Sequence, residues 1–314
     1  MFYPGASYSG IVEVINAGFV TDDILHRKVE GFGSIFTFDD KDVGRLLVRK
    51  PDSNKGTYGR TLIIAGSKNM GGAAILSASA AYRSGTGLVK VLTHEVNKTA
   101  LLCRMPECLI STYLDNMPLA AELKADFEWA KSIAVGPGLS MNGVAAEITR
   151  CVLEREDKVR ILDADALNII AAEHIDYKGS NEGRIIITPH IMEMSRLTGK
   201  TTADIKEHMI ETAKEYAIQH SCICILKDAR TVVTDGQKVY INCTGNDGMS
   251  TGGCGDVLTG LIAGMTAMGL DAFDAACLSV YVHGKAGDYA AAGKGRAGMT
   301  AADISEAIAY VLKR

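Results

Sequence analysis

TGNDGMSTGGCGDVLTG (residues 244–260) joins a glycine-rich loop to a helix. Its first part is rich in glycine and poor in apolar residues, which indicates a loop. From Asp256 onward, apolar residues recur at helical spacing, namely Val257, Leu258, Leu261, Ile262 and Met265. A helix that begins near Gly255-Asp256 directs free backbone N–H groups and the positive end of its dipole at one place. That place is suited to an anion such as phosphate.

Asp256 lies at the same place, although a carboxylate repels phosphate. Two roles remain for it. It could cap the helix, or it could accept a proton from a substrate hydroxyl that attacks the phosphate. The long glycine run before it favours the second role, that of a general base.

Length and composition restrict the class of protein. The chain has 314 residues, 47% of them hydrophobic and 22% charged, as in an ordinary globular protein of one large or two small domains. A net charge of −4 without a basic run argues against nucleic acid or an anionic membrane as a partner. No run of 18 apolar residues and no signal-peptide pattern is present, so we expect a cytoplasmic protein.

The eight cysteines do not have the spacing of a zinc site. We expect most of them to be reduced and buried, as Cys222 and Cys224 would be within an apolar strand. Cys254 differs because it lies in the glycine loop. It is either a thiol activated by the helix N-terminus or a residue that contributes only its backbone N–H.

From residue 61 onward, short apolar segments alternate with helical ones, which predicts a parallel sheet covered by helices. The first unit has a strand at 61–65, a helix at 73–84 and a strand at 88–92. Four more apolar strands, expected side by side, lie at 132–135, 159–162, 184–187 and 221–226. Ligands bind outside the carboxyl ends of such strands. The unusual residues of this chain follow those ends, namely Gly136-Pro137-Gly138, Asp163-Ala164-Asp165, Thr188-Pro189-His190 and Lys227-Asp228.

The remaining segments complete one α/β domain. A hairpin is predicted at 231–241, a long helix at 271–292, and a final helix that opens with a capping box at Thr300 and ends near Leu312. The leading segment is less regular, with a strand at 10–15, a capped turn at 21–23 and helical character within 38–47. A turn-rich boundary lies at 51–56.

Several motifs, in this order, resemble those of the ADP- or ATP-dependent NAD(P)H-hydrate dehydratases. The resemblance extends over about residues 52–312, and it is the order of the motifs that makes it specific. Three positions depart from the family pattern: Cys254, Asp228, and Ile191-Met192. The motifs are Asn54-Lys55-Gly56-Thr57-Tyr58-Gly59-Arg60, Ala65-Gly66-Ser67 with Gly72-Ala73-Ala74, Gly136-Pro137-Gly138, residues 162–168, Thr188-Pro189-His190 with Glu193, Leu226-Lys227, residues 245–258, and His283-Gly284.

The resemblance implies a ribokinase-like fold, with a central mostly parallel sheet and helices on both faces. It implies a lyase that repairs hydrated NADH and NADPH with ADP or ATP as co-substrate and Mg²⁺ as cofactor. The ring hydroxyl would be phosphorylated and the phosphate then eliminated. Homo-oligomers, tetramers in this family, are implied as well. Both nucleotides have the adenosine and the α- and β-phosphates, so the sequence leaves ADP and ATP open.

The resemblance also implies site residues. Asp256 would be the catalytic base and would bind the substrate together with Ala74, Gly138 and His190. Glu193 would hold a water of the Mg²⁺ ion. The nucleotide would lie against Lys227, Asp228, Ala229, Arg230, Thr231, Gly253, Cys254 and Gly255.

Each assignment has a simpler alternative. His190 could be structural, Glu193 and Lys227 could be solvated, and at least one of Asp163 and Asp165 is expected to cap a helix or shape a turn. Gly138 and Ala74 could serve helix–sheet packing alone. Packing is also the expected role of Met249 and Met265.

The leading segment, residues 1–50, carries a second resemblance. Tyr3-Pro4-Gly5-Ala6 and Tyr8-Ser9-Gly10 are similar to the tail of the epimerase domain that precedes many dehydratases. We therefore expect residues 1–50 to be a remnant of that tail and residues 51–314 to be the dehydratase domain. An epimerase domain or protein is a possible partner. Two other functions stay open: a kinase of a small alcohol such as a sugar or hydroxymethylpyrimidine, and a non-catalytic nucleotide-binding module.

Overall fold

The structure is a computed structural model that describes residues 35–115, 120–179 and 185–313. The strand predicted at 10–15 and the turn predicted at 21–23 lie outside these ranges.

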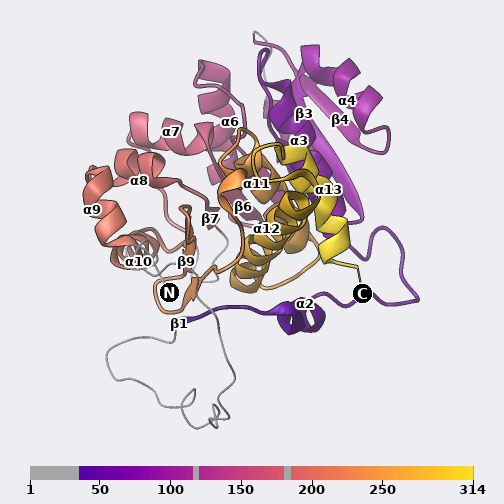
Figure 1. Cartoon of the computed structure of the whole chain (residues 1–314). Helices are drawn as coiled ribbons and strands as arrows, with labels where there is room; N and C mark the ends of the chain where they lie inside the picture. Colours follow the sequence, from indigo (N-terminus) through magenta and orange to yellow (C-terminus); the bar gives the residue numbers. More distant parts are fainter. Residues whose placement is uncertain (1–34, 116–119, 180–184, 314) are drawn as a thin grey trace.

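One sheet runs through the molecule, and ten strands of it lie in the described ranges, in the order β1-β10-β9-β8-β7-β6-β5-β2-β3-β4 (Figure 1). Every neighbouring pair is parallel except β8–β9 and β9–β10. The prediction of a mostly parallel sheet is confirmed. The strands are β1 (Ile35–Phe36), β2 (Arg60–Ile64), β3 (Leu88–His94), β4 (Leu109–Tyr113), β5 (Ser132–Val135), β6 (Val159–Leu162), β7 (Ile185–Ile187), β8 (Ile223–Leu226), β9 (Val232–Thr234) and β10 (Val239–Ile241).

The four apolar strands expected to lie side by side are β5, β6, β7 and β8, and they are adjacent in the sheet. The carboxyl ends of these parallel strands therefore meet at one edge. The predicted hairpin is the antiparallel pair β9–β10.

Helices cover both faces of the sheet, as predicted. The buried residues of α3, α11, α12 and α13 pack on one face, and those of α5, α6 and α10 pack on the other. The described helices are α2 (Asp40–Leu46), α3 (Gly71–Ser84), α4 (Lys98–Arg104), α5 (Ala120–Trp129), α6 (Gly143–Leu153), α7 (Asp165–Ala172), α8 (Ile191–Thr198), α9 (Thr202–Glu207), α10 (Met209–His220), α11 (Cys254–Ala267), α12 (Ala272–Lys294) and α13 (Ala301–Val311), with 3₁₀ turns η2 (Glu95–Asn97) and η3 (Asp247–Met249).

Alternate strand residues face the two helical layers, which gives the sheet two hydrophobic cores. In β2, Ile63 packs into the core with α11 and α12, whereas Leu62 and Ile64 pack into the core with α6 and α10. This alternation is the period of two that a pleated strand imposes. Both faces are apolar because both are covered, which explains why the strands appear in the sequence as continuous apolar runs.

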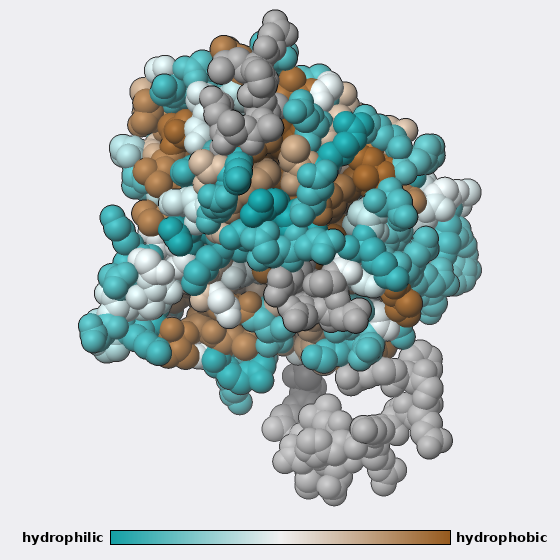
Figure 2. Space-filling model, turned by 180° about the vertical axis from the view of Figure 1, so that it is seen from behind, coloured by the Kyte–Doolittle hydropathy of each residue, from teal (hydrophilic) through white to brown (hydrophobic). Residues whose placement is uncertain are grey.

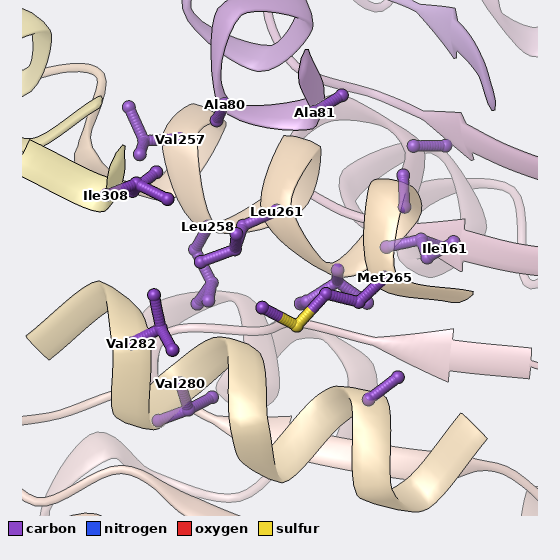
Figure 3. Close-up of a cluster of buried hydrophobic side chains, with 14 of the residues drawn as sticks. Ala80, Ala81, Ile161, Val257, Leu258, Leu261, Met265, Val280, Val282 and Ile308 are labelled. Carbon is purple, nitrogen blue, oxygen red and sulfur yellow. The ribbon is translucent and has the colours of Figure 1, made fainter. Parts of the chain in front are cut away.

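Helix α11 is the centre of the first core (Figure 3). Leu258 and Leu261 lie between α3, α12 and α13, and Met265 is fully buried. Two glycines let α11 approach α3 backbone to backbone. A Cβ on Gly260 would lie 1.9 Å from the carbonyl oxygen of Ser77, and one on Gly264 would lie 2.0 Å from Oγ of Ser84. The loop before α11 is thereby fixed against the start of α3.

The segment just before the predicted boundary at 51–56 is attached to the same fold. Strand β1 pairs with β10 in parallel. In α2, Asp40 accepts a hydrogen bond of 2.7 Å from the Tyr281 hydroxyl of α12 and forms an ion pair of 3.1 Å with Lys285.

The face shown in Figure 2 is largely hydrophilic, with hydrophobic residues in separate patches. Among the described helices, none has the length and apolar character needed to cross a membrane.

Candidate active site

The N-terminus of α11 is open to a ligand. Its N-cap, Gly253, has a φ of +91° and provides no side-chain cap. A Cβ at this position would lie 2.5 Å from Cδ1 of Leu76, so both backbone and packing require glycine. The first hydrogen bond of the helix joins Val257 N–H to the Gly253 carbonyl. The earlier N–H groups therefore have no acceptor within the helix. That of Cys254 makes only a long contact of 3.4 Å with the Thr251 carbonyl.

Asp256 lies in the first turn of α11 and does not cap it, because the helix has no side-chain cap bond. Burial, followed by the negative charge of Asp163, raises the pKa of Asp256 to about 7. Lys227 opposes this effect and Asp165 adds to it. A carboxylate with such a pKa is well matched to accept a proton near neutral pH. Of the two roles open to Asp256, the geometry excludes the cap and favours the base.

Asp163 and Lys227 form the buried polar centre beside α11. Asp163 is 1% exposed, and its Oδ1 accepts hydrogen bonds from Lys227 Nζ at 2.9 Å and from Thr188 Oγ1 at 2.7 Å. Its Oδ2 accepts one of 2.7 Å from Thr259 Oγ1. Burial acts to raise the pKa of Asp163, but Lys227 and these hydrogen bonds hold it below its usual value. Asp163 is therefore ionised, and both of its carboxylate oxygens accept hydrogen bonds.

Lys227 reaches the anion site at the start of α11. A Cβ on Gly255 would lie 3.5 Å from Nζ of Lys227. Burial acts to lower the pKa of Lys227, yet Asp163 and Glu193 raise it above its ordinary value. A fixed positive charge thus lies against the free N–H groups of α11, which suits a phosphate. The alternative of a merely solvated lysine is wrong.

His190 and Glu193 form the capping box of α8. Nδ1 of His190 accepts from the backbone N–H groups of Met192 at 3.0 Å and Glu193 at 3.3 Å. In return, Oε2 of Glu193 accepts the His190 N–H at 2.8 Å. The structural role weighed for His190 is therefore present. Its Nε2 lies 3.5 Å from Oε1 of Glu193, on a half-exposed side chain that can still meet a ligand.

Glu193 is 4% exposed, so it is not on a solvated helix face. Burial, followed by Asp163, raises the pKa of its carboxyl, and Lys227 lowers it. In the described part of the chain, no three His, Cys, Asp or Glu side chains gather as a metal cage. A divalent cation would find here one buried carboxylate, which fits an ion held mainly by phosphate oxygens and water.

Gly138 lies in the loop after β5, and Ala74 lies in the first turn of α3, beside the loop after β2. Gly138 has a φ of +57°, and a Cβ would lie 2.9 Å from the Cβ atoms of Ala73 and Met70. Its carbonyl accepts the Ser67 N–H at 2.6 Å. Ala74 is fully buried, and its Cβ would be 3.0 Å from a Cβ on Gly66. The packing role proposed for both residues is thus visible in their contacts.

The loop 227–231, between β8 and β9, holds the other predicted nucleotide contacts. Lys227 N–H donates to the Pro189 carbonyl at 2.8 Å, which fixes this loop beside His190. Thr231 Oγ1 donates to the Asp228 carbonyl at 3.3 Å. Asp228 and Ala229 are exposed and Arg230 is half-buried. Of residues 227–231, Lys227 is the one whose side chain donates a hydrogen bond to Asp163.

The structure tests the predictions about Cys254 and about the reduced state of the cysteines. Cys254 is 8% exposed, and burial raises the pKa of its thiol, so the activated-thiol alternative is wrong. None of the eight cysteines, all of which lie in the described ranges, forms a disulfide. Cys222 and Cys224 are buried as predicted.

Three residues of the centre had no assigned role in the sequence. Thr188 and Thr259 hold Asp163, as described above. The third is His283 on α12, whose ring lies beside the backbone of Cys254 and whose Nε2 has no hydrogen-bond partner among the described residues. Burial lowers the pKa of His283 to about 4, so its ring is neutral. The only sequence signal for them was their place inside or directly after the motifs.

A family model described as NAD(P)H-hydrate dehydratase matches residues 61–310. A relative from Moorella thermoacetica, named a bifunctional NAD(P)H-hydrate repair enzyme, is 37% identical over 99% of this chain. The chain spans 59% of the length of that relative.

Solved structures of related proteins have the same fold. An ADP/ATP-dependent NAD(P)H-hydrate dehydratase from Bacillus subtilis, co-crystallised with ATP and Mg²⁺, superposes with a TM-score of 0.77 at 30% identity, covering 88% of this chain and 97% of that one. A ribokinase-like superfamily protein from Enterococcus faecalis gives 0.81 at 27% identity, covering 91% and 98%. The predicted fold class is confirmed.

Proposed function

The chain belongs to the NAD(P)H-hydrate dehydratase family, and we propose that it returns the hydrates of NADH and NADPH to the intact cofactors at the expense of ADP or ATP. The observation that carries this proposal is the position of Asp256. A carboxylate whose pKa is raised to about 7 lies in the first turn of a helix whose N–H groups are free. A proton acceptor and a phosphate cradle at one place suit phosphoryl transfer to a hydroxyl group.

In the proposed reaction, the carboxylate of Asp256 takes the proton of the ring hydroxyl. The hydroxyl oxygen then forms a bond to the terminal phosphorus of the nucleotide, and the bond from that phosphorus to its bridging oxygen breaks. ATP leaves as ADP, or ADP leaves as AMP. The new phosphate ester departs as inorganic phosphate when its carbon–oxygen bond breaks. Loss of a proton from the neighbouring ring carbon completes the double bond.

Each part of the centre has a task in this proposal. The N–H groups of Gly253, Cys254 and Gly255 and the ammonium of Lys227 stabilise negative charge on the transferring phosphoryl group. Asp163 orients that ammonium through their 2.9 Å hydrogen bond. The loop 228–231 holds the adenosine part. His190 and Gly138 border the substrate ring, and Ala74, which is fully buried, supports this wall from behind.

A Mg²⁺ ion, when bound, neutralises phosphate charge. Glu193 is the residue that would hold it through water, because its carboxylate is buried and only one oxygen accepts the backbone bond of the cap.

We also propose the wider setting. The dehydratase domain comprises residues 51–314 together with β1 and α2, which pack onto it, and the segment before β1 is the end of a preceding epimerase domain, in keeping with the bifunctional name of the Moorella relative. A homotetramer in the cytoplasm is the proposed form. Size measurement by light scattering tests the assembly.

The direct test is to incubate the protein with acid-hydrated NADH, Mg²⁺ and either ATP or ADP. We expect the absorbance of the reduced nicotinamide to return. No return with either nucleotide would overturn the proposal. Accumulation of a stable phosphorylated alcohol, in a screen of small alcohols, would instead support a kinase.

A further inference from the structure

A small polar hollow opens beside the predicted substrate loops. Its volume is about 200 Å³, and it lies between the carboxyl ends of β2, β3, β4 and β5. The residues that matter among those lining it are Ser67, Lys68, His94, Asp115, Ser140 and Asn142. At about 30 Å³ for each water, it holds the volume of some seven waters. One sugar or one phosphate group fits such a space.

His94 presents an unpaired donor there. Its side chain is buried, and its Nδ1 accepts the Val96 N–H at 3.3 Å. In the neutral ring the proton must therefore be on Nε2. Within the described residues, Nε2 has no hydrogen-bond partner. The nearest carboxylate oxygen, Oδ1 of Asp115, is 3.6 Å away, beyond hydrogen-bond length. A buried donor of this kind is costly unless water or a ligand satisfies it.

Ser140 is a second unsatisfied group in the hollow. Its Oγ is inaccessible and lacks a partner in the described ranges. Its backbone has a φ of +67°, unusual for a residue other than glycine. Asp165 holds it in place by accepting the Ser140 N–H at 2.8 Å. Strain and an unpaired hydroxyl at one position indicate a binding role.

The loops that line the hollow also carry residues of the predicted active site. Gly138, two residues before Ser140, receives the Ser67 N–H on its carbonyl. Asp165, which holds Ser140, is close enough to Asp256 for its charge to raise the pKa of that carboxyl. A substrate whose ring lies at Asp256 and Gly138 can therefore extend into the hollow.

We propose that this hollow binds the ribose of the dinucleotide substrate that is remote from the hydrated ring, with His94 Nε2 and Ser140 Oγ as donors. This inference rests on the proposed function. The charge of Lys68 is already paired with Asp115, so the hollow offers hydrogen bonds without an unpaired positive charge, which suits a ribose. These donors position the substrate without taking part in the reaction.

The experiment compares His94→Asn and Ser140→Ala with the unchanged protein. Asparagine keeps an acceptor for the Val96 N–H, as a good N-cap residue does, and removes the Nε2 donor. Ser140→Ala removes only the hydroxyl. Loss of one hydrogen bond should raise KM for hydrated NADH roughly three- to tenfold, with little change in kcat or in KM for the nucleotide. His174→Asn, an exposed histidine outside the hollow, is the matched control.

Hydrated nicotinamide mononucleotide in its reduced form lacks the remote ribose. Its KM should be the same in the variants and the unchanged protein. Equal increases for both substrates, or no increase for hydrated NADH, would overturn the inference. Calorimetric binding of NADH, with ATP filling the nucleotide site, gives the same comparison without turnover. Weaker NADH binding in both variants supports the hollow even if no dehydration is observed, and unchanged binding refutes it.

Discussion

Lys227 Nζ donates a hydrogen bond of 2.9 Å to Oδ1 of Asp163, and the two residues come from the ends of different strands. This pair connects the free end of α11 with the loop that holds His190. Both groups are charged, because each shifts the pKa of the other away from neutrality. The resulting centre fixes one positive charge beside the phosphate cradle and leaves Asp256 as the carboxylate that can change its charge near neutral pH.

Asp256→Asn should lower kcat by a factor of about 10² to 10⁴, because amide nitrogen and oxygen cannot accept the hydroxyl proton. Nucleotide affinity should remain or increase, since a negative charge near the phosphates is removed. Regeneration of NADH and calorimetric ATP binding measure the two effects. Asp157→Asn, an exposed carboxylate, is the control. Full activity of the Asp256 variant would point to a non-catalytic binding module.

The pH dependence of kcat/KM should show an acid limb near 7, where Asp256 loses its charge. Below that pH the rate should fall about tenfold per unit, as for a single essential base. Asp165→Asn removes one negative neighbour while its amide oxygen can still accept the Ser140 N–H. The limb should then move to lower pH. A limb that stays in place would show that Asp165 does not act on Asp256.

Asp256 should also make the folded protein less stable as pH rises. Its pKa is higher in the folded chain than the ordinary value of 3.8, so the folded state holds the proton more tightly. The free energy of unfolding should therefore decrease between about pH 4 and 7. Asp256→Asn should remove this loss and gain on the order of 1 to 3 kcal/mol at pH 8, with little gain at pH 4. Urea unfolding at the two pH values measures it, and an equal gain at both would contradict it.

Lys227→Met should cost about 3 kcal/mol of stability, because Asp163 would be left buried without its cation. The double variant Lys227→Met, Asp163→Asn should cost less than the two single losses added together. A double-mutant cycle in urea gives the coupling. Additive losses would mean that Thr188 and Thr259 alone satisfy Asp163.

Gly260→Ala should destabilise the protein by about 1 to 3 kcal/mol, because the new Cβ would lie 1.9 Å from the Ser77 carbonyl oxygen. Gly293→Ala, in an exposed turn of α12 with nothing near the new methyl group, should instead add up to about 1 kcal/mol. Thermal unfolding of the two variants compares them. Equal effects would show that the contact between α3 and α11 can relax.

Apolar runs and turn residues were sufficient to predict most of the sheet. Strands β5 and β6 begin and end at the predicted residues, because both faces are covered and turn residues follow each strand directly. Strand β1 was missed because two residues carry no pattern. Strand β4 was missed because it lies at the edge of the sheet, with Leu109 exposed and little alternation to detect.

The sequence predicted the site only to the extent that the carboxyl ends of neighbouring parallel strands meet at one edge of the sheet. Asp256 and Lys227 were identified, since each ends a recognisable motif. The division between Asp163, ionised and saturated with donors, and Asp165, which holds a turn, depends on three-dimensional partners. The same is true of His283, which contacts Cys254 across two helices. The raised pKa of Asp256 arises mainly from burial, which depends on the folded structure and cannot be read from the sequence.

The backbone contact between α11 and α3 has a consequence for how the two substrates meet. Gly260 and Gly264 hold the two helices in close contact, and such close packing resists a shift of one helix along the other. The phosphate cradle at the start of α11 and the glycine turn at the start of α3 are thus held at a constant separation in the folded chain. Folding therefore aligns the two substrate sites in advance, and little of the binding energy of either substrate is needed to bring the reacting atoms together.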